Sequence, residues 1–242
     1  MRAPVLLVVH NRNSRPGQVA AALAAKGWPT RRCCPRAGDA LPESFDVIAG
    51  VVVFGGPMSA NDDATLPFIR AELDWIPKVL ASKTPFFGIC LGAQMLARCL
   101  GGTVGPHARG LHEIGYYPIE PTAEGAALFP EPVQVYHWHG EGFTLPADAE
   151  LLATGETYRN QMFRCNGSAY GVQFHPEMQE DILKWWMQQA THKLGAPGAQ
   201  PPEAQLTGHA RHAAAMHRWL DGFLDHWLSD AAKSGSRLIG PI

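Results

Sequence analysis

Residues 85–102 read PFFGICLGAQMLARCLGG, an apolar run that passes through Cys90 into a segment with a helical pattern. Gly88 and Gly92 stand two residues before and after the cysteine. Glycines at these positions relieve the crowding of a sharp strand-to-helix turn, which points its central side chain away from both elements. The stretch therefore predicts a strand, a presented Cys90 and a helix, the junction at which a nucleophile is built. The alternative is a small apolar core residue that ends a buried strand.

The predicted helix start also bears on the reactivity of the cysteine. Unpaired backbone N–H groups and the positive end of the helix dipole lower the pKa of a thiol from about 8.5 toward neutrality. The same amides, that of Leu91 above all, could hold an oxyanion during acyl transfer. The junction thus predicts an activated thiol beside an oxyanion site.

A second segment, residues 170–177 (YGVQFHPE), ends an alternating apolar run in His175, Pro176 and Glu177. Residues i and i+2 of an extended chain point the same way, so the imidazole and the carboxylate can share a face. A carboxylate beside an imidazole fixes its tautomer and supports the imidazolium, as a thiol-activating base requires. The order nucleophile, histidine, acid differs from that of the α/β-hydrolases, in which the acid lies far from the histidine. Taken alone, the segment is also typical of a surface ion pair.

Three separated motifs give the chain its resemblance to a known family: GGP at 55–57, GICLGAQ at 88–94 and FHPE at 174–177. Together they resemble the class I glutamine amidotransferases, and among these the stand-alone proteins similar to the amidotransferase domain of GMP synthetase. The match runs from about Val5 to Glu177. By this resemblance Cys90 attacks the side-chain amide of glutamine, His175 is the base and Glu177 orients it. Ammonia leaves, and water releases glutamate from a γ-glutamyl thioester.

The resemblance also implies binding residues. It assigns the Gly56 and Leu91 N–H groups to the oxyanion hole and Gln94, one helical turn after the cysteine, to the amino-acid end of the substrate. Residues 138–141 occupy the place of the family's Ser-His-Gly-Asp stretch, which binds substrate mostly through its backbone. The substrate-binding residues implied there are Trp138, His139, Gly140 and Glu141. Tryptophan and glutamate depart from the family pattern and put the shape of the pocket in question.

A metal or cofactor is not expected. His137 and His139 form a His-x-His pair, but no third ligand clusters with them in the sequence. The chain contains no Gly-x-x-x-x-Gly-Lys-Ser/Thr loop, and Gly101, Gly102 and Gly105 are too sparse for a dinucleotide fingerprint. We therefore expect no nucleotide and no cofactor.

Composition narrows the class of protein. A chain of 242 residues, 46% hydrophobic, can bury one substantial core. The net charge of -2 and the lack of basic clusters argue against a nucleic-acid partner. The N-terminal apolar run is too short for a signal sequence or a membrane span. Five cysteines without paired metal spacing favour a reducing cytoplasm. These are Cys33, Cys34, Cys90, Cys99 and Cys165.

Strands alternating with helices predict an α/β fold, with a doubly wound, mostly parallel sheet flanked by helices. Helices are expected at 17–26 and 66–80, and buried strands at the N-terminus, before Gly55 and before Cys90. After Gly102 the pattern changes to short hairpin strands, expected to form a small antiparallel layer that closes over the active site. These are residues 114–119, 133–138, 150–153 and 161–164.

The C-terminal part is expected to be a helical extension. Residues 1–193 form the amidotransferase domain and end in a helix from 178, while 194–242 contain a linker and a helix over about 203–229. Apolar residues recur on that helix at helical spacing, so most of this stripe should pack on the same domain. A homodimer or partner-protein contact is the lesser alternative.

Three functions fit these observations. The first is glutamine hydrolysis that delivers ammonia to a separate synthetase subunit. The second is a free-standing hydrolase of γ-glutamyl peptides, similar to the plant γ-glutamyl peptidases. The third, a non-catalytic regulatory module, is disfavoured because Cys90, His175 and Glu177 are all present. The sequence leaves open the physiological substrate, the acceptor of ammonia and the oligomeric state.

Overall fold

The computed structural model describes residues 2–235, with side chains over 2–229, and is built on a nine-stranded sheet. The strand order is β2-β1-β3-β4-β11-β10-β9-β6-β7. The first five strands of this order run parallel to one another. They are β2 (Thr30–Cys33), β1 (Val5–Val8), β3 (Gly50–Val53), β4 (Phe86–Ile89) and β11 (Ala169–Val172). This is the doubly wound half that the sequence predicted.

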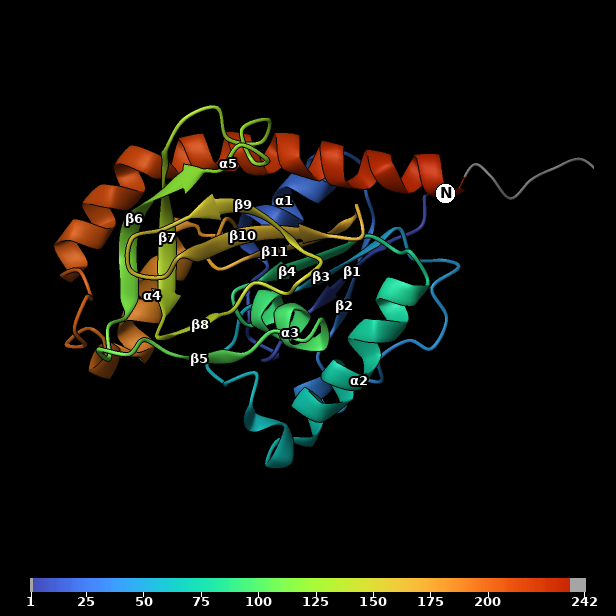
Figure 1. Cartoon of the computed structure of the whole chain (residues 1–242), viewed down its shortest axis with the longest axis horizontal. Helices are drawn as coiled ribbons and strands as arrows, with labels where there is room; N and C mark the ends of the chain where they lie inside the picture. The colour runs from blue at the N-terminus through green and yellow to red at the C-terminus, as the bar shows by residue number, and fades with distance from the viewer. Residues whose placement is uncertain (1, 236–242) are drawn as a thin grey trace, which may run out of the picture.

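Helices cover both faces of the parallel half (Figure 1). One face packs against α1 (Gly17–Ala25) and α5 (Pro202–Gly235), and the other against α2 (Pro67–Ala81) and α3 (Leu91–Cys99). The remaining α-helix, α4 (Glu180–Gln189), follows β11, the last strand in the chain. Because both faces are covered, the central strands are apolar throughout instead of alternating. Burial of both faces explains why runs such as VLLV at the N-terminus form strands.

The hairpin segments correct one expectation. All four predicted segments are strands, but they extend the large sheet in antiparallel fashion instead of forming a layer over it. They are β6 (Glu113–Pro121), β7 (Val133–His139), β9 (Glu150–Thr154) and β10 (Asn160–Cys165). A small antiparallel sheet is present, formed by β5 (Val104–Pro106) and β8 (Glu141–Phe143). The predicted fold class is confirmed with this rearrangement of its strands.

Helix α5 lies across the sheet face that also carries α1 (Figure 1). A Cβ atom added to Gly50 in β3 would lie 2.9 Å from the Trp227 ring, so the helix packs directly on the sheet. The buried apolar residues of this helix share one hydrophobic core with α1 and the sheet. The buried members are Met216, Leu220, Phe223, Leu224, Trp227 and Leu228. Residues 236–242 of the predicted extension lie outside the described residues.

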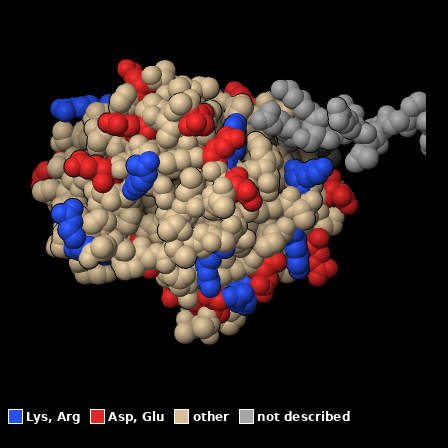
Figure 2. Space-filling view, viewed as in Figure 1, with Lys and Arg blue, Asp and Glu red and all other residues tan. Residues whose placement is uncertain are grey.

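The surface mixes charges of both signs. On the face shown in Figure 2, basic and acidic side chains are interspersed and leave wide uncharged areas between them. Within residues 2–235, no helix combines the length and the apolar character that crossing a membrane requires.

Candidate active site

Cys90 stands at the turn between β4 and α3, as predicted. Its backbone has φ 50° and ψ −104°, a left-handed conformation that few residues other than glycine adopt. Both neighbouring glycines are needed for close packing: a Cβ atom on Gly88 would lie 2.5 Å from the Gly92 carbonyl oxygen. One on Gly92 would lie 2.1 Å from the Val53 oxygen. The glycines therefore let the turn pack against the sheet while the cysteine adopts a strained backbone.

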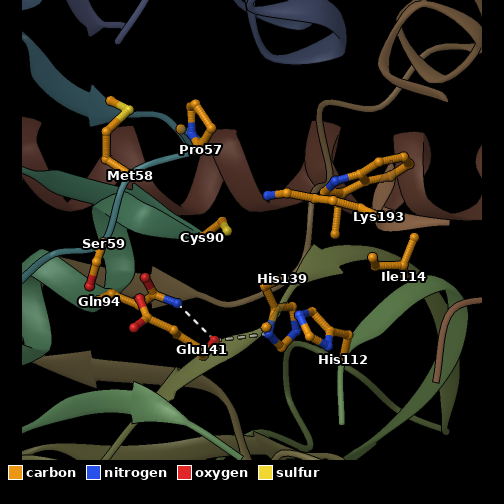
Figure 3. A pocket seen from close by; sticks show the side chains of 13 residues that line it. Pro57, Met58, Ser59, Cys90, Gln94, His112, Ile114, His139, Glu141 and Lys193 are labelled. Atoms are coloured by element: carbon orange, nitrogen blue, oxygen red, sulfur yellow. Dashed lines mark hydrogen bonds between the residues drawn. The ribbon is translucent and has the colours of Figure 1, made fainter. Parts of the chain in front are cut away.

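The cysteine is less exposed than expected. The sequence predicted a presented side chain, but Cys90 is only 5% exposed. It opens into one cavity of about 290 Å³, shown in Figure 3. Cys90 is therefore a pocket residue and not a presented surface residue.

His175 reaches the cysteine because two neighbouring strands end together. Strands β4 and β11 are parallel, and Ile89 is in register with Val172. The Cys90 N–H donates to the Val172 carbonyl oxygen at 2.8 Å. Residues that follow the two strands therefore emerge at the same edge of the sheet, where sites in open α/β sheets lie.

The histidine forms a buried pair with Glu177. His175 Nδ1 lies 2.8 Å from a Glu177 carboxylate oxygen. A Cβ atom on Gly55 would lie 2.8 Å from the His175 ring and 3.4 Å from Cys90 Cβ, so both side chains border the same glycine. The structure thus brings together the three residues that the sequence selected.

The surroundings of His175 favour its protonated form. Burial alone would lower its pKa, but the Glu177 carboxylate and the sulfur of Cys90 outweigh burial and raise the pKa to about 10. Cys90 lies close enough to the ring to raise its pKa both through its charge and through a side-chain hydrogen bond. An imidazolium in this position stabilises a thiolate.

The loop at Gly55 and Gly56 lies beside the start of α3. A Cβ atom on Gly56 would lie 3.1 Å from the Leu91 side chain, and neither the Gly56 nor the Leu91 amide has a hydrogen-bond acceptor among the described residues. His10 Nδ1 donates to the Gly55 carbonyl oxygen at 3.0 Å, and its Nε2 lies 3.0 Å from the Glu72 carboxylate. Because a peptide group is planar, holding the Gly55 carbonyl also fixes the direction of the Gly56 N–H. The sequence did not single out His10 or Glu72.

Gln94 links α3 to the opposite wall. Its side-chain amide donates to the Glu141 carbonyl oxygen at 2.9 Å and to Gln173 Oε1 at 3.2 Å. Gln173 in turn directs Nε2 to Cys90 Sγ at 3.6 Å. The sequence offered a signal for this residue: it precedes His175 by two in an extended segment and therefore shares its face. Gln94 lines the pocket, and Gln173 is an additional contact of Cys90.

A second buried cluster supports the pocket wall. His139 Nδ1 donates to the Glu141 carbonyl oxygen at 2.9 Å, and its Nε2 lies 3.0 Å from Glu113 Oε2. His137 Nδ1 lies 3.4 Å from the same oxygen and 3.2 Å from His139 Nε2. Gln161 Nε2 also donates to that oxygen, at 3.0 Å. We call Glu113, His137 and His139 the Glu113 cluster.

The Glu113 cluster overturns the reason for expecting no metal. Glu113 is the third candidate ligand, which the spacing along the sequence did not reveal. One carboxylate oxygen of Glu113 and one ring nitrogen of each histidine lie within 4.8 Å of one another. Burial would raise the pKa of Glu113, but the hydrogen bond to His139 and the charge of His137 lower it to about 2. Burial is the main cause that lowers the pKa of His137 to about 3. Hydrogen bonds among these groups and to their neighbours account for the arrangement.

The predicted residues Trp138 and Gly140 also line the pocket. Trp138 packs edge-on against Trp186 of α4, with ring centroids 5.9 Å apart. A Cβ atom on Gly140 would lie 2.3 Å from the His112 ring, so glycine lets that ring close on the wall. Further lining residues were not expected from the sequence, since their segments meet only in the fold. They are Pro57, Met58, Ser59, His112, Ile114 and Lys193 (Figure 3).

Comparison with known proteins identifies relatives over most of the chain. The family model for glutamine amidotransferase class-I matches residues 38–183. The chain is 32% identical over 191 residues to the glutamine amidotransferase-like protein YfeJ of Salmonella typhimurium, covering 76% of each protein. It is 31% identical over 146 residues to GMP synthase of Cytophaga hutchinsonii. That match covers 58% of this chain but only 27% of the synthase.

Solved structures resemble the whole fold. A glutamine amidotransferase of Thermotoga maritima has a TM-score of 0.86 at 30% identity, with 94% of this chain and 99% of that chain covered. A glutamine amidotransferase of Methylobacillus flagellatus has a TM-score of 0.87 at 26% identity, with 95% of each chain covered. The likeness extends well beyond the three motifs.

Proposed function

The chain belongs to the class-I glutamine amidotransferase family, and from that premise we propose that it hydrolyses a γ-glutamyl amide through a thioester on Cys90. Membership supports hydrolysis or transfer of the glutamine amide in general. The pair of His175 and Glu177 beside Cys90 is the observation that carries the finer proposal. A buried imidazolium held by one carboxylate is what a cysteine nucleophile needs from its partner.

In the first half of the reaction, the Cys90 thiolate attacks the γ-carbonyl carbon of the substrate. The carbonyl oxygen becomes an oxyanion, and the free N–H groups of Gly56 and Leu91 are the donors aimed at it. His175 gives its proton to the leaving nitrogen. The C–N bond breaks, the amine leaves, which is ammonia when the substrate is glutamine, and the γ-glutamyl thioester remains.

In the second half, His175 takes a proton from water as the water attacks the thioester carbonyl. The C–S bond breaks, glutamate leaves and the thiolate and imidazolium are restored. Glu177 keeps the ring oriented throughout, with its carboxylate 2.8 Å from Nδ1. The pathway needs no cofactor.

The partner of this reaction is a separate question. The GMP synthase of Cytophaga hutchinsonii is nearly four times as long as the segment it shares with this chain, since the match covers 27% of it. We propose glutamine as the first substrate to test and a separate synthetase subunit as a candidate acceptor of ammonia. Hydrolysis of γ-glutamyl peptides uses the same thioester and differs only in the leaving amine.

Replacement of the nucleophile tests the proposal. Cys90→Ala should abolish glutamate release from glutamine and from γ-glutamyl peptides, while Cys99→Ala should leave both rates near those of the unaltered protein. Cys99 is the matched control because its Sγ contacts the Leu73 carbonyl oxygen and does not line the pocket. Unchanged turnover in Cys90→Ala would contradict a thioester mechanism and favour the regulatory module.

A second assay distinguishes a glutamine amidotransferase from a hydrolase of γ-glutamyl peptides. Purified protein is given glutamine, γ-glutamyl amino acids or glutathione, and glutamate release is followed. Strong peptide cleavage with negligible glutaminase activity would count against amidotransfer. Isolation of the native protein with a synthetase that raises the glutaminase rate would count in its favour.

A further inference from the structure

Lys193 enters the catalytic pocket from a segment that follows α4. It ends the short helical turn Thr191–Lys193 and is partly buried. Its side chain lines the same cavity as Cys90, and Figure 3 shows the amine directed into that cavity from the wall facing the cysteine. A cation therefore faces the space in which the substrate must lie.

The ammonium of Lys193 has no ion pair or hydrogen bond among the described side chains. Other lysines differ. Lys26, whose side chain is 15% exposed, lies 3.0 and 2.7 Å from two aspartate carboxylates. Lys78 and Lys83 have no such partner but are exposed to solvent. An unpaired, partly buried charge is unfavourable, and an anion that binds beside it removes that penalty.

Lys193 and Glu141 are the charged side chains of the pocket, apart from its histidines. Glu141 lies beside Gln94, on the other side of Cys90 from the lysine amine (Figure 3). The cavity thus has a negative end and a positive end with the nucleophile between them. A molecule with an ammonium group toward Glu141 and a carboxylate toward Lys193 complements this distribution of charge.

We propose that Lys193 binds a carboxylate of the γ-glutamyl substrate and thereby determines which substrates the pocket accepts. This inference rests on the proposed function, because it assumes that the γ-amide lies at Cys90. Two carboxylates could satisfy the lysine: the α-carboxylate of the glutamyl group, or one carried by the leaving amine, as in γ-glutamyl amino acids. Both are the same chemistry, and substrate choice distinguishes them.

The test uses Lys193→Met with three substrates: glutamine, γ-glutamyl p-nitroanilide and γ-glutamylglycine. Loss of one charged hydrogen bond should raise KM about 10- to 100-fold and leave kcat nearly unchanged. If the lysine binds the α-carboxylate, KM rises for all three substrates. If it binds a carboxylate carried by the leaving amine, KM rises for γ-glutamylglycine alone. An unchanged KM for every substrate, or a loss confined to kcat, would overturn the proposal.

Two control variants separate charge from structure. Lys193→Arg keeps the charge and should restore most of the affinity. Lys184→Met removes an equal charge from an exposed position on α4, where Lys184 pairs with Glu180, and should leave KM unchanged. An effect in Lys184→Met as large as that in Lys193→Met would assign the loss to net charge and overturn a specific contact.

A binding measurement keeps this inference separate from the proposed function. In the Cys90→Ala background, a change in intrinsic tryptophan fluorescence, to which Trp138 in the same pocket contributes, reports binding of γ-glutamylglycine and glutamate without turnover. Binding of either ligand that weakens about 10- to 100-fold in Cys90→Ala/Lys193→Met supports the lysine contact even if the protein hydrolyses nothing. Equal binding of both ligands by the two proteins would reject the contact even if hydrolysis is established.

Discussion

Two buried groups of histidine and glutamate lie close to the pocket. The pKa of a histidine is raised in one group and lowered in the other. In the pair of His175 and Glu177, one carboxylate serves one imidazole, and the pKa of His175 is raised to about 10. In the Glu113 cluster, one carboxylate lies between two imidazoles, and the pKa of His137 is lowered to about 3. Both histidines are buried, so burial does not distinguish them.

The two pKa values differ because Glu177 serves one imidazole, whereas Glu113 is shared by two. Burial penalises a charged imidazole in both places, and a dedicated carboxylate, with the sulfur of Cys90, overcomes that penalty for His175. Glu113 also raises the pKa of His137, but His139 and His175 add to the effect of burial. A dedicated pair can thus hold a proton for chemistry, whereas the shared carboxylate leaves His137 neutral in the supporting wall.

The largest expected effect comes from replacing one histidine in each of the two groups and comparing the losses in kcat. His175→Asn should lower kcat by about 10³-fold or more, because the thiolate loses its cation and the leaving amine its acid. His137→Asn should lower kcat less than about 10-fold, because the contacts of this ring are with Glu113 and His139 in the supporting wall. The check is the rate of glutamate release by both variants, with far-UV circular dichroism spectra to show that both are folded. Equal losses in two folded variants would remove the distinction between the groups.

The next effect concerns Glu177, the carboxylate of the pair proposed for catalysis. Glu177→Gln should lower kcat/KM about 10²-fold and move the alkaline limb of its pH profile to lower pH. The sign follows from the pKa of His175: without the carboxylate, burial is less opposed and the ring loses its proton earlier. The profile should be measured from pH 5 to about 11, so that the limb of the unaltered protein near the pKa of His175 is included. A limb that stays in place would show that Glu177 does not control the proton.

The same carboxylate should affect stability. The pKa of His175 is raised above its ordinary value of 6.5, so its contribution to folding is fully present below pH 6.5 and is lost as the pH rises through about 10. Urea unfolding of the unaltered protein and Glu177→Gln at pH 6 and 10 should therefore differ more at the lower pH.

A smaller effect is expected at a third buried pair, His10 and Glu72. Glu72→Gln should weaken the hold of His10 on the Gly55 carbonyl and loosen the aim of the Gly56 N–H. We expect kcat to fall about 3- to 10-fold, well below the loss for removing an oxyanion donor, with KM unchanged. A variant in which KM rises and kcat does not would place the pair in substrate binding instead.

The smallest effect on turnover is expected for Glu113→Gln. The pKa of Glu113 is lowered to about 2, so the stability it contributes is present above its ordinary value of 4.5 and is lost as the pH falls toward 2. Unfolding free energies of the variant should therefore depend less on pH between about 5 and 3 than those of the unaltered protein. Identical slopes would contradict an ionised Glu113 in the folded protein.

The positions of the three residues proposed for catalysis were largely predictable from sequence because the geometry around each is local. Two glycines and an apolar run specify the turn at Cys90, and a spacing of two in extended chain specifies that His175 and Glu177 share a face. The central parallel strands were predictable for a similar reason, since strands covered on both sides are continuous apolar runs, whereas the mostly exposed edge strand β2 was not predicted. Hairpin strands were found as strands but misplaced, because periodicity gives no information on which neighbour a strand pairs with.

The pocket wall could not be read in the same way. Glu113 and His137 belong to different strands that become neighbours only through the pairing of β6 with β7. The Lys193 side chain arrives from a turn beyond α4, where no motif marks it. Burial of Cys90 was missed as well, since a turn determines the direction of a side chain but not what covers it.

By itself, the sequence determined the turn that carries Cys90, the alternation of buried strands and helices along the first half of the chain, and the family. Local sterics and hydrophobic burial act over a few residues, so the chain carries that information in short stretches. Tertiary structure alone decided which carboxylate serves which histidine and that a lysine faces the cysteine across the pocket. Those choices depend on distances of a few ångströms between distant segments, and at such distances the electrostatics of a buried group are set by its neighbours in space.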